Sequence, residues 1–234
     1  PDLCSSILPL VLRMKDYRTG IKSLVDLGFS KLYVSAGMHR SGSTLLYNAI
    51  RLCLLSRYSK LSCGFVSDLG TIDKSPVYLI KTHNIYNVLR YRSNMIFYSY
   101  RDVRDAMVSM SRKFGKPPTL EMCDAFIEEF IRAKRCSHFI YRYEDFSLDY
   151  VALVENVSRD LGILVDLDQI VSGLPRASVG SEETAGPDLQ TQMHGGHASG
   201  TKACEWRDVW PKALQLEVNN KYKWWFEENC YPLS

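Results

Sequence analysis

Short apolar runs rich in β-branched and aromatic residues alternate along the chain with longer segments whose apolar residues recur three and four positions apart. The short runs, expected as strands, are residues 31–35, 77–81, 95–99 and 139–141. The longer segments, expected as helices, are residues 43–57, 103–112, 120–134, 148–161 and 212–228. Because strands that alternate with helices form parallel sheets, the pattern predicts an α/β fold with a mainly parallel central sheet flanked by helices.

The length of 234 residues suits one large domain and is too short for two comfortable ones. We therefore expect a single domain over residues 1–234, with residues 1–30 as an N-terminal extension. Residues 173–200 are rich in Gly, Ser, Thr and Pro. A loop of that length in a compact domain is typical of a lid or a substrate-binding segment, and the alternative is a disordered segment.

The composition of the chain limits which ligands and which cellular compartment we expect. The net charge of +3 is mild, so nucleic acid is not indicated and any anion site must come from local basic clusters. Seven cysteines occur without zinc-ligand spacing or a disulfide framework, and His194 and His197 have no third ligand, so no metal is expected. No apolar run is long enough to cross a membrane. A cytoplasmic location is expected, while an anchor upstream of Pro1 stays open.

A glycine turn follows the first predicted strand, between Gly37 and Thr44, and leads directly into an apolar helix. A strand, a glycine turn and a helix N-terminus together form a cradle for a phosphate or sulfate group. The spacing of Gly37 and Gly42 matches a Walker A loop, but Ser43 occupies the position of the Walker A lysine. The positively charged residue of this turn is instead Arg40. The alternative is an ordinary turn whose Ser41 or Ser43 caps the helix.

A second basic segment ends the strand at residues 95–99, with Arg101 followed eight positions later by Ser109. Ligands of open α/β sheets bind at the carboxyl ends of strands, so these two side chains are candidates for a second phosphate. The alternative is a network of surface ion pairs among Arg101, Asp102, Arg104 and Asp105.

A third candidate site ends the strand at residues 77–81, where Lys81 is followed by Thr82 and His83. Histidine is the side chain best tuned to accept a proton near neutral pH, so His83 is the candidate general base. The alternative is a histidine that merely caps the strand.

These segments resemble the sulfotransferases that use 3′-phosphoadenosine 5′-phosphosulfate (PAPS). Arg40 to Thr44, in the order Arg, Ser, Gly, Ser, Thr, is similar to the first signature of that family. Arg101 with Ser109 has the spacing of the second signature, and Lys81 to His83 resembles the catalytic segment of the cytosolic branch. Residues 200–207 resemble, in part, the third element, although Cys204 stands where that element has glycine.

The resemblance implies a role for each matching residue. It implies a P-loop-NTPase-like sulfotransferase fold in which Arg40 contacts the sulfuryl group, His83 is the base and Lys81 assists. The resemblance assigns the other cofactor contacts to Ser41, Gly42, Ser43, Thr44, Arg101, Ser109, Tyr143, Gly200, Thr201 and Lys202. Leu45 stands where the cytosolic branch usually has an adenine-stacking Trp, so part of the adenine site must lie elsewhere.

The implied reaction is the in-line transfer of a sulfuryl group from PAPS to a hydroxyl or amine of a small molecule or glycan, leaving adenosine 3′,5′-bisphosphate (PAP). Other branches of the family use a glutamate as the general base, and this is an alternative to His83. Two other functions are also alternatives: a P-loop kinase or NTPase, and a non-catalytic module that binds anions such as sulfated glycans. The acceptor would be chosen by loops at residues 63–74, 114–119 and 180–200, whose shape the sequence does not predict.

Overall fold

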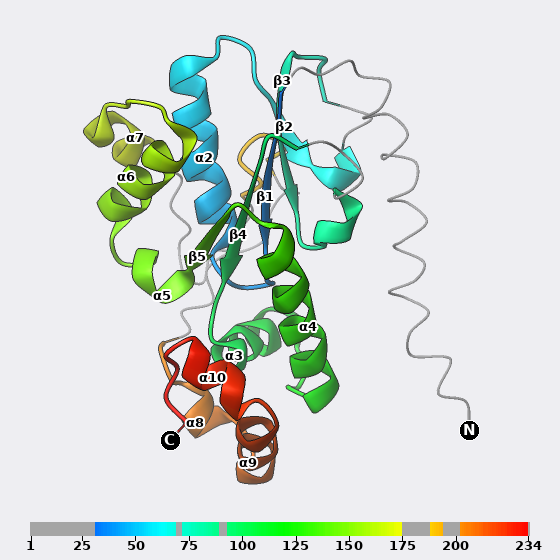
Figure 1. Ribbon diagram of the computed structural model, residues 1–234. Coiled ribbons are helices and arrows are strands. Elements are labelled where there is room, and N and C mark those ends of the chain that lie inside the picture. The colour runs from blue at the N-terminus through cyan, green and yellow to red at the C-terminus, as the bar shows by residue number, and fades with distance from the viewer. Residues whose placement is uncertain (1–30, 69–71, 89–92, 175–187, 194–201, 234) are drawn as a thin grey trace.

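The computed structural model describes residues 31–68, 72–88, 93–174, 188–193 and 202–233. Its centre is a sheet of five strands in the order β2-β3-β1-β4-β5, and every neighbouring pair is parallel (Figure 1). The strands are β1 Lys31–Gly37, β2 Ser62–Phe65, β3 Val77–Thr82, β4 Met95–Tyr100 and β5 Phe139–Arg142. The predicted α/β fold with a parallel sheet is confirmed.

Alternate residues of the strands feed two separate cores, one on each face of the sheet. Tyr33 and Leu79 face the helices α2 (Ser43–Arg57), α6 (Tyr150–Leu161) and α7 (Leu167–Gly173). Val34 and Ile80, one position along, face α3 (Val103–Phe114), α4 (Leu120–Cys136) and the C-terminal helices. Because successive side chains of a strand point to opposite faces, the continuous apolar runs are what a sheet covered on both faces requires. Figure 1 shows α2, α6 and α7 to the left of the sheet and α4 to its right.

Side-chain caps set the start of most of the longer helices. Asp102 accepts a hydrogen bond from the Arg104 amide at the start of α3, and Thr119 accepts one from the Met122 amide at the start of α4. Asp149 caps α6 in the same way, which is why this helix begins at Tyr150 and not at the predicted residue 148.

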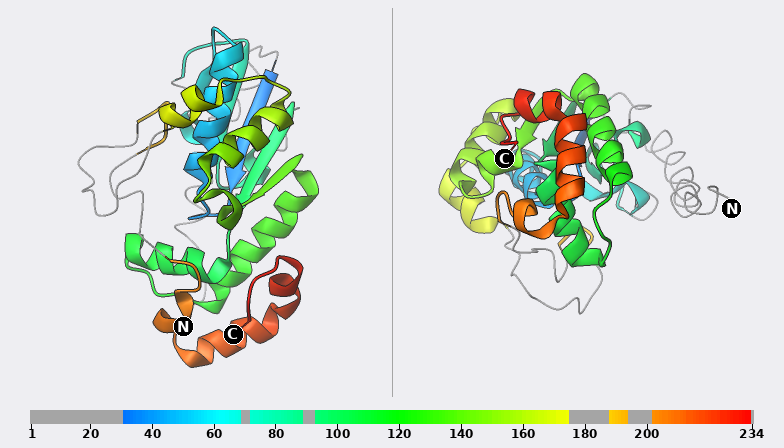
Figure 2. Two further views of the ribbon diagram at one scale, coloured as in Figure 1. Left: turned by 90° about the vertical axis from the view of Figure 1, so that its left-hand side faces the viewer. Right: turned by 90° about the horizontal axis from the view of Figure 1, so that it is seen from below.

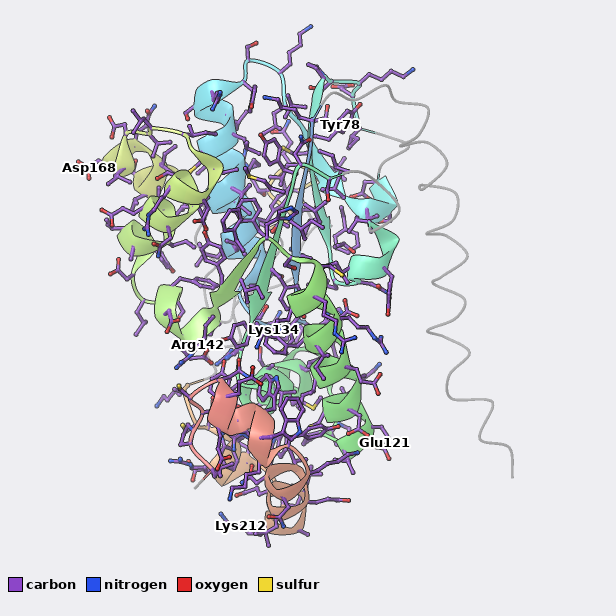
Figure 3. The ribbon with its side chains drawn as sticks, viewed as in Figure 1. Tyr78, Glu121, Lys134, Arg142, Asp168 and Lys212 are labelled. Atoms are coloured by element: carbon purple, nitrogen blue, oxygen red, sulfur yellow. The ribbon has the colours of Figure 1, made fainter. Side chains whose placement is uncertain are left out.

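The C-terminal helices lie against α3 and α4 at the end of the molecule below the sheet (Figures 1 and 2). They are α8 (Trp206–Val209), α9 (Lys212–Lys221) and α10 (Lys223–Glu228). Trp225 and Phe226 are buried in the core, whereas Trp224 is 48% exposed. Lys134 and Arg142, labelled in Figure 3, also contact this segment, through Glu228 and the Tyr231 ring respectively.

Three sequence predictions of secondary structure were wrong in detail. Part of the loop expected at residues 63–74 is strand β2, followed by the short helical turn Val66–Asp68. Another short helical turn, Ile85–Asn87, lies outside that loop and follows β3. The helix expected at 212–228 is split into α9 and α10 around Tyr222, whose backbone is not helical. Residue 173, the expected start of the long loop, ends α7. None of the described helices is long and apolar enough to cross a membrane.

Candidate active site

The glycine turn after β1 is tied to the neighbouring strand β4. The Met38 amide donates to the Ser99 carbonyl oxygen at 2.9 Å, and the Ser41 amide closes the turn onto the Met38 carbonyl oxygen at 3.3 Å. The buried Ser41 hydroxyl lies 2.7 Å from the Met38 carbonyl oxygen and 2.8 Å from the Ser99 hydroxyl. The Ser41 side chain therefore fixes the turn to the sheet.

Two glycines allow the backbone to approach its surroundings closely. A Cβ at Gly37 would lie 2.4 Å from the Ser99 hydroxyl oxygen, which leaves no room for a side chain. Gly42 has a φ of 70° and precedes α2, and a Cβ there would lie 2.7 Å from the ring of Tyr143. No side chain caps α2. The alternative in which Ser41 or Ser43 caps this helix is therefore wrong, and the first turn keeps the geometry of an anion cradle.

Arg40 joins the glycine turn to the second basic segment. Its Nε donates to the Ser109 hydroxyl oxygen on α3 at 2.8 Å. Burial and the charge of Arg101 both lower the pKa of the Arg40 guanidinium. Residues predicted as two separate phosphate contacts thus meet at one edge of the sheet.

Lys81 brings the third candidate segment to the same place. Its Nζ donates to the Thr44 hydroxyl at the start of α2, and only 4% of the residue is exposed. Burial, together with the charge of Arg40, lowers the pKa of Lys81 to about 7. Ser43 is also buried, beside Gly37 at the entrance to the helix. Cations that repel one another at the end of three parallel strands favour an anionic ligand between them.

Arg101 lies over the ring of Tyr143, with the guanidinium carbon 4.4 Å from the ring centroid. Tyr143 begins the short helix α5 (Tyr143–Phe146) and also touches the Gly42 position, so it links both basic segments. The alternative of surface ion pairs is wrong, because the charged side chains in this stretch are buried. The residues concerned are Arg101, Asp102, Arg104 and Asp105.

Arg104, which the sequence suggested only as a member of a surface ion-pair network, is a buried structural residue. It is fully buried, pairs with Asp102 at 2.7 Å, and lies between the rings of Trp206 and Phe226. Its Nη1 donates to the Asn219 side chain at 2.8 Å. Arg104 therefore clamps the C-terminal helices to the start of α3, next to Arg101. Apart from Asp102, its hydrogen-bond partners lie more than 100 residues away in sequence, so no local pattern could have revealed this role.

Asp105 attaches the C-terminal segment to α3. Its carboxylate accepts hydrogen bonds from the Cys204 amide at 2.7 Å and the Trp206 amide at 3.3 Å. Burial, with a smaller contribution from Asp102, raises the pKa of Asp105 to about 6. Cys204 has a φ of 61°, the backbone region that favours glycine, so the glycine that the resemblance led us to expect here would suit this backbone.

The described structure covers only part of the predicted third element. Lys202 is exposed and its amide donates to the Glu205 carboxylate at 2.9 Å. Gly200, Thr201, His194 and His197 lie outside the described residues. Within the described ranges, no three His, Cys, Asp or Glu side chains are grouped as metal ligands would be.

His83 lies directly beside the glycine turn. Its Nδ1 is 2.8 Å from the Gly37 carbonyl oxygen. A carbonyl oxygen can only accept, so in this contact Nδ1 carries the proton and Nε2 of the neutral ring keeps its lone pair. The ring also stacks on His39. The structure thus brings His83, Lys81, Arg40 and Arg101 to one edge of the sheet.

No protein-family model and no curated protein sequence matches the chain. Solved structures do. Mouse sulfotransferase SULT7A1 complexed with PAP has a TM-score of 0.57 and 16% identity, over 86% of this chain and 88% of that one. Retinol dehydratase with retinol and PAP has a TM-score of 0.58 and 12% identity, over 88% of this chain and 84% of that one. Retinol dehydratase with androsterone and inactive cofactor PAP has a TM-score of 0.55 and 15% identity, over 89% of this chain and 84% of that one. The chain has the fold of the sulfotransferases.

Proposed function

We propose that this protein is a sulfotransferase that uses PAPS as donor. The observation that carries the proposal is the 2.8 Å hydrogen bond from Arg40 Nε to Ser109 Oγ. It joins the glycine turn, expected to hold the 5′ end of the nucleotide, to the segment expected to hold its 3′-phosphate. Both are then within reach of one molecule, and the structures with this fold described above contain PAP.

The hydrogen-bond donors of the candidate site suit a nucleotide with phosphates at both ends. The uncapped first turn of α2, with Ser43 and Thr44, supplies amide and hydroxyl donors for the 5′-phosphate. Arg101 and the Ser109 hydroxyl proton, which the contact with Arg40 does not use, suit the 3′-phosphate. The third element, with Gly200, Thr201 and Lys202, is proposed to complete this end.

The adenine platform is proposed to include Tyr143. Its ring stacks on the guanidinium of Arg101, which is a proposed contact of the 3′-phosphate, and this supports an adenine site nearby. Leu45 offers no such face, and this is consistent with part of the platform lying on α5.

The chemistry divides among three side chains. Bound PAPS would supply a sulfuryl group whose bond to the 5′-phosphate oxygen breaks as a bond to the acceptor oxygen forms. His83 would take the acceptor proton on Nε2, because the Gly37 carbonyl holds the proton on Nδ1. Arg40 and Lys81 would stabilise the charge that gathers on the departing phosphate. We propose a small hydroxyl compound as acceptor, as retinol and androsterone in the retinol dehydratase complexes are both alcohols.

The test is transfer of labelled sulfate from PAPS to a panel of phenols, alcohols, sugars and peptides. We expect turnover with at least one hydroxyl acceptor, and a loss of about 10²–10⁴-fold in kcat for His83→Ala with PAP affinity unchanged. Binding of ATP with Mg²⁺ in preference to PAP would favour a kinase instead. Failure to bind either nucleotide would favour an anion-binding module.

A further inference from the structure

A carboxylate of α3 holds the turn at residues 202–206, which leads into α8. Asp105 uses one carboxylate oxygen for the Cys204 amide, at 2.7 Å, and the other for the Trp206 amide, at 3.3 Å. Asp105 is buried, so water competes little for these bonds. Because both oxygens accept from main-chain donors, the carboxylate fixes the path of the chain through the turn.

The same turn is tied to α3 a second time, farther along the helix. Glu205 pairs with Arg112 through one carboxylate oxygen, and its other oxygen accepts a hydrogen bond from the Lys202 amide at 2.9 Å. Asp105 and Arg112 are two helical turns apart, so they lie on one face of α3, about 10 Å from each other. Ser109 lies between them on that face. The turn therefore runs along the face of α3 that carries Ser109.

We propose that Asp105 is a positioning residue for the site of the donor's 3′-phosphate. Arg101 and Ser109, the proposed contacts of that phosphate, lie four residues before and four residues after Asp105. Lys202, at the start of the turn, is proposed to complete the site. By holding the turn along α3, Asp105 sets where the Lys202 main chain lies relative to the other two contacts. The inference rests on the proposed function, because that function supplies the 3′-phosphate.

The charge of Asp105 opposes phosphate binding, so the proposed role is geometric. Burial raises the pKa of Asp105 to about 6 while the charge of Arg101 acts the other way, so the carboxylate is ionised at pH 8 and lies within range of that charge. Loss of the negative charge alone would strengthen phosphate binding, whereas release of the turn would weaken it. Asp105→Asn removes the charge and keeps an oxygen for the Cys204 amide, and Asp105→Ala removes both.

The test is calorimetric titration at pH 8 with PAP and with 5′-AMP, which lacks the 3′-phosphate. We expect Asp105→Ala to bind PAP about tenfold more weakly than wild type, with its affinity for 5′-AMP unchanged. Asp105→Asn should stay within about threefold of wild type, because it keeps the shorter of the two bonds. The control is Asp124→Ala, which frees α9 from α4 by removing the partner of Lys221 and leaves the turn untouched. Its affinity for PAP should be that of wild type.

Two results of the titration would overturn the proposal. One is an Asp105→Ala protein that keeps the wild-type preference for PAP over 5′-AMP, and the other is an equal loss in the Ala and Asn variants. A further readout needs no nucleotide: the Cys204 and Trp206 amides should exchange hydrogen faster in Asp105→Ala than in wild type. Unchanged exchange would also overturn the proposal. A wild type that binds PAP and 5′-AMP equally, with exchange as expected, would refute the proposed function and with it the phosphate role of Asp105, while the attachment of the turn would stand.

Discussion

Replacing Lys81 with methionine is expected to make the protein more stable while abolishing transfer. The Lys81 ammonium is buried beside Arg40, and burial and that charge lower its pKa from an ordinary 10.5 to about 7. The folded state therefore holds a cation that it disfavours, and the hydrogen bond to Thr44 offsets part of this cost. Methionine has nearly the same length and carries no charge, so it fills the site without the penalty.

The size of the effect follows from the pKa. One pH unit corresponds to about 1.4 kcal/mol, so a fall from 10.5 to about 7 corresponds to about 5 kcal/mol at most. Between these pH values the unfolded chain holds a proton that native Lys81 has lost, so the stability of the wild type rises with pH in this window. The advantage of Lys81→Met should therefore be greatest at pH 6 and should be smaller at pH 9 by about 2–3 kcal/mol.

The assay is urea unfolding of both proteins at pH 6 and pH 9, with Lys60→Met as control. Lys60 is exposed, so its replacement should change the free energy of unfolding by less than about 0.5 kcal/mol at either pH. A Lys81→Met protein that is less stable than wild type at pH 6, or whose advantage does not shrink with pH, would refute the reasoning.

Three further substitutions test the packing around the site. Cys204→Gly relieves a left-handed backbone and should raise the free energy of unfolding by about 1 kcal/mol. This would be measured as an increase in Tm of about 2–4 °C, and the control Cys204→Ala should show no such increase. Gly42→Ala forces a Cβ to 2.7 Å from Tyr143 at a φ of 70°, and should weaken PAP binding at least tenfold in a calorimetric titration; unchanged affinity would argue against this turn as the nucleotide site. Arg104→Met leaves Asp102 as a buried charge without its partner and should lower stability by about 3–5 kcal/mol in urea unfolding, whereas a loss below 1 kcal/mol would contradict the clamp.

The sequence predicted the parts of the fold that depend on local pattern. The alternation of apolar runs indicated four of the five strands, and the periodic run after the glycine turn has the bounds of α2. Strand β2 was missed because Ser62–Phe65 has no β-branched residue, and it is a strand only through pairing with β3. The split between α9 and α10 follows from tertiary packing around Tyr222, which periodicity does not register.

The sequence named most residues of the candidate site but not the contacts between them. The sequence singled out Arg40 by its charge in the glycine turn and Ser109 by its spacing from Arg101, and it gave no sign that the two side chains touch. His39 was overlooked because a single histidine in a turn carries no periodic signal, and its stacking on His83 depends on where β1 and β3 end. Contacts between residues far apart in sequence are set by strand order, which the pattern of apolar residues does not define.

The central claim is that one nucleotide with phosphates at both ends lies between Arg40 and Arg101. Calorimetric titration of wild type and Arg101→Gln with PAP and with 5′-AMP, which lacks the 3′-phosphate, tests it most directly. A charge-assisted hydrogen bond contributes about 1.5–3 kcal/mol, so wild type should bind PAP about 10–100-fold more tightly than 5′-AMP. Arg101→Gln should lose most of that difference while its affinity for 5′-AMP is unchanged. Equal affinity of the wild type for the two nucleotides would contradict the account.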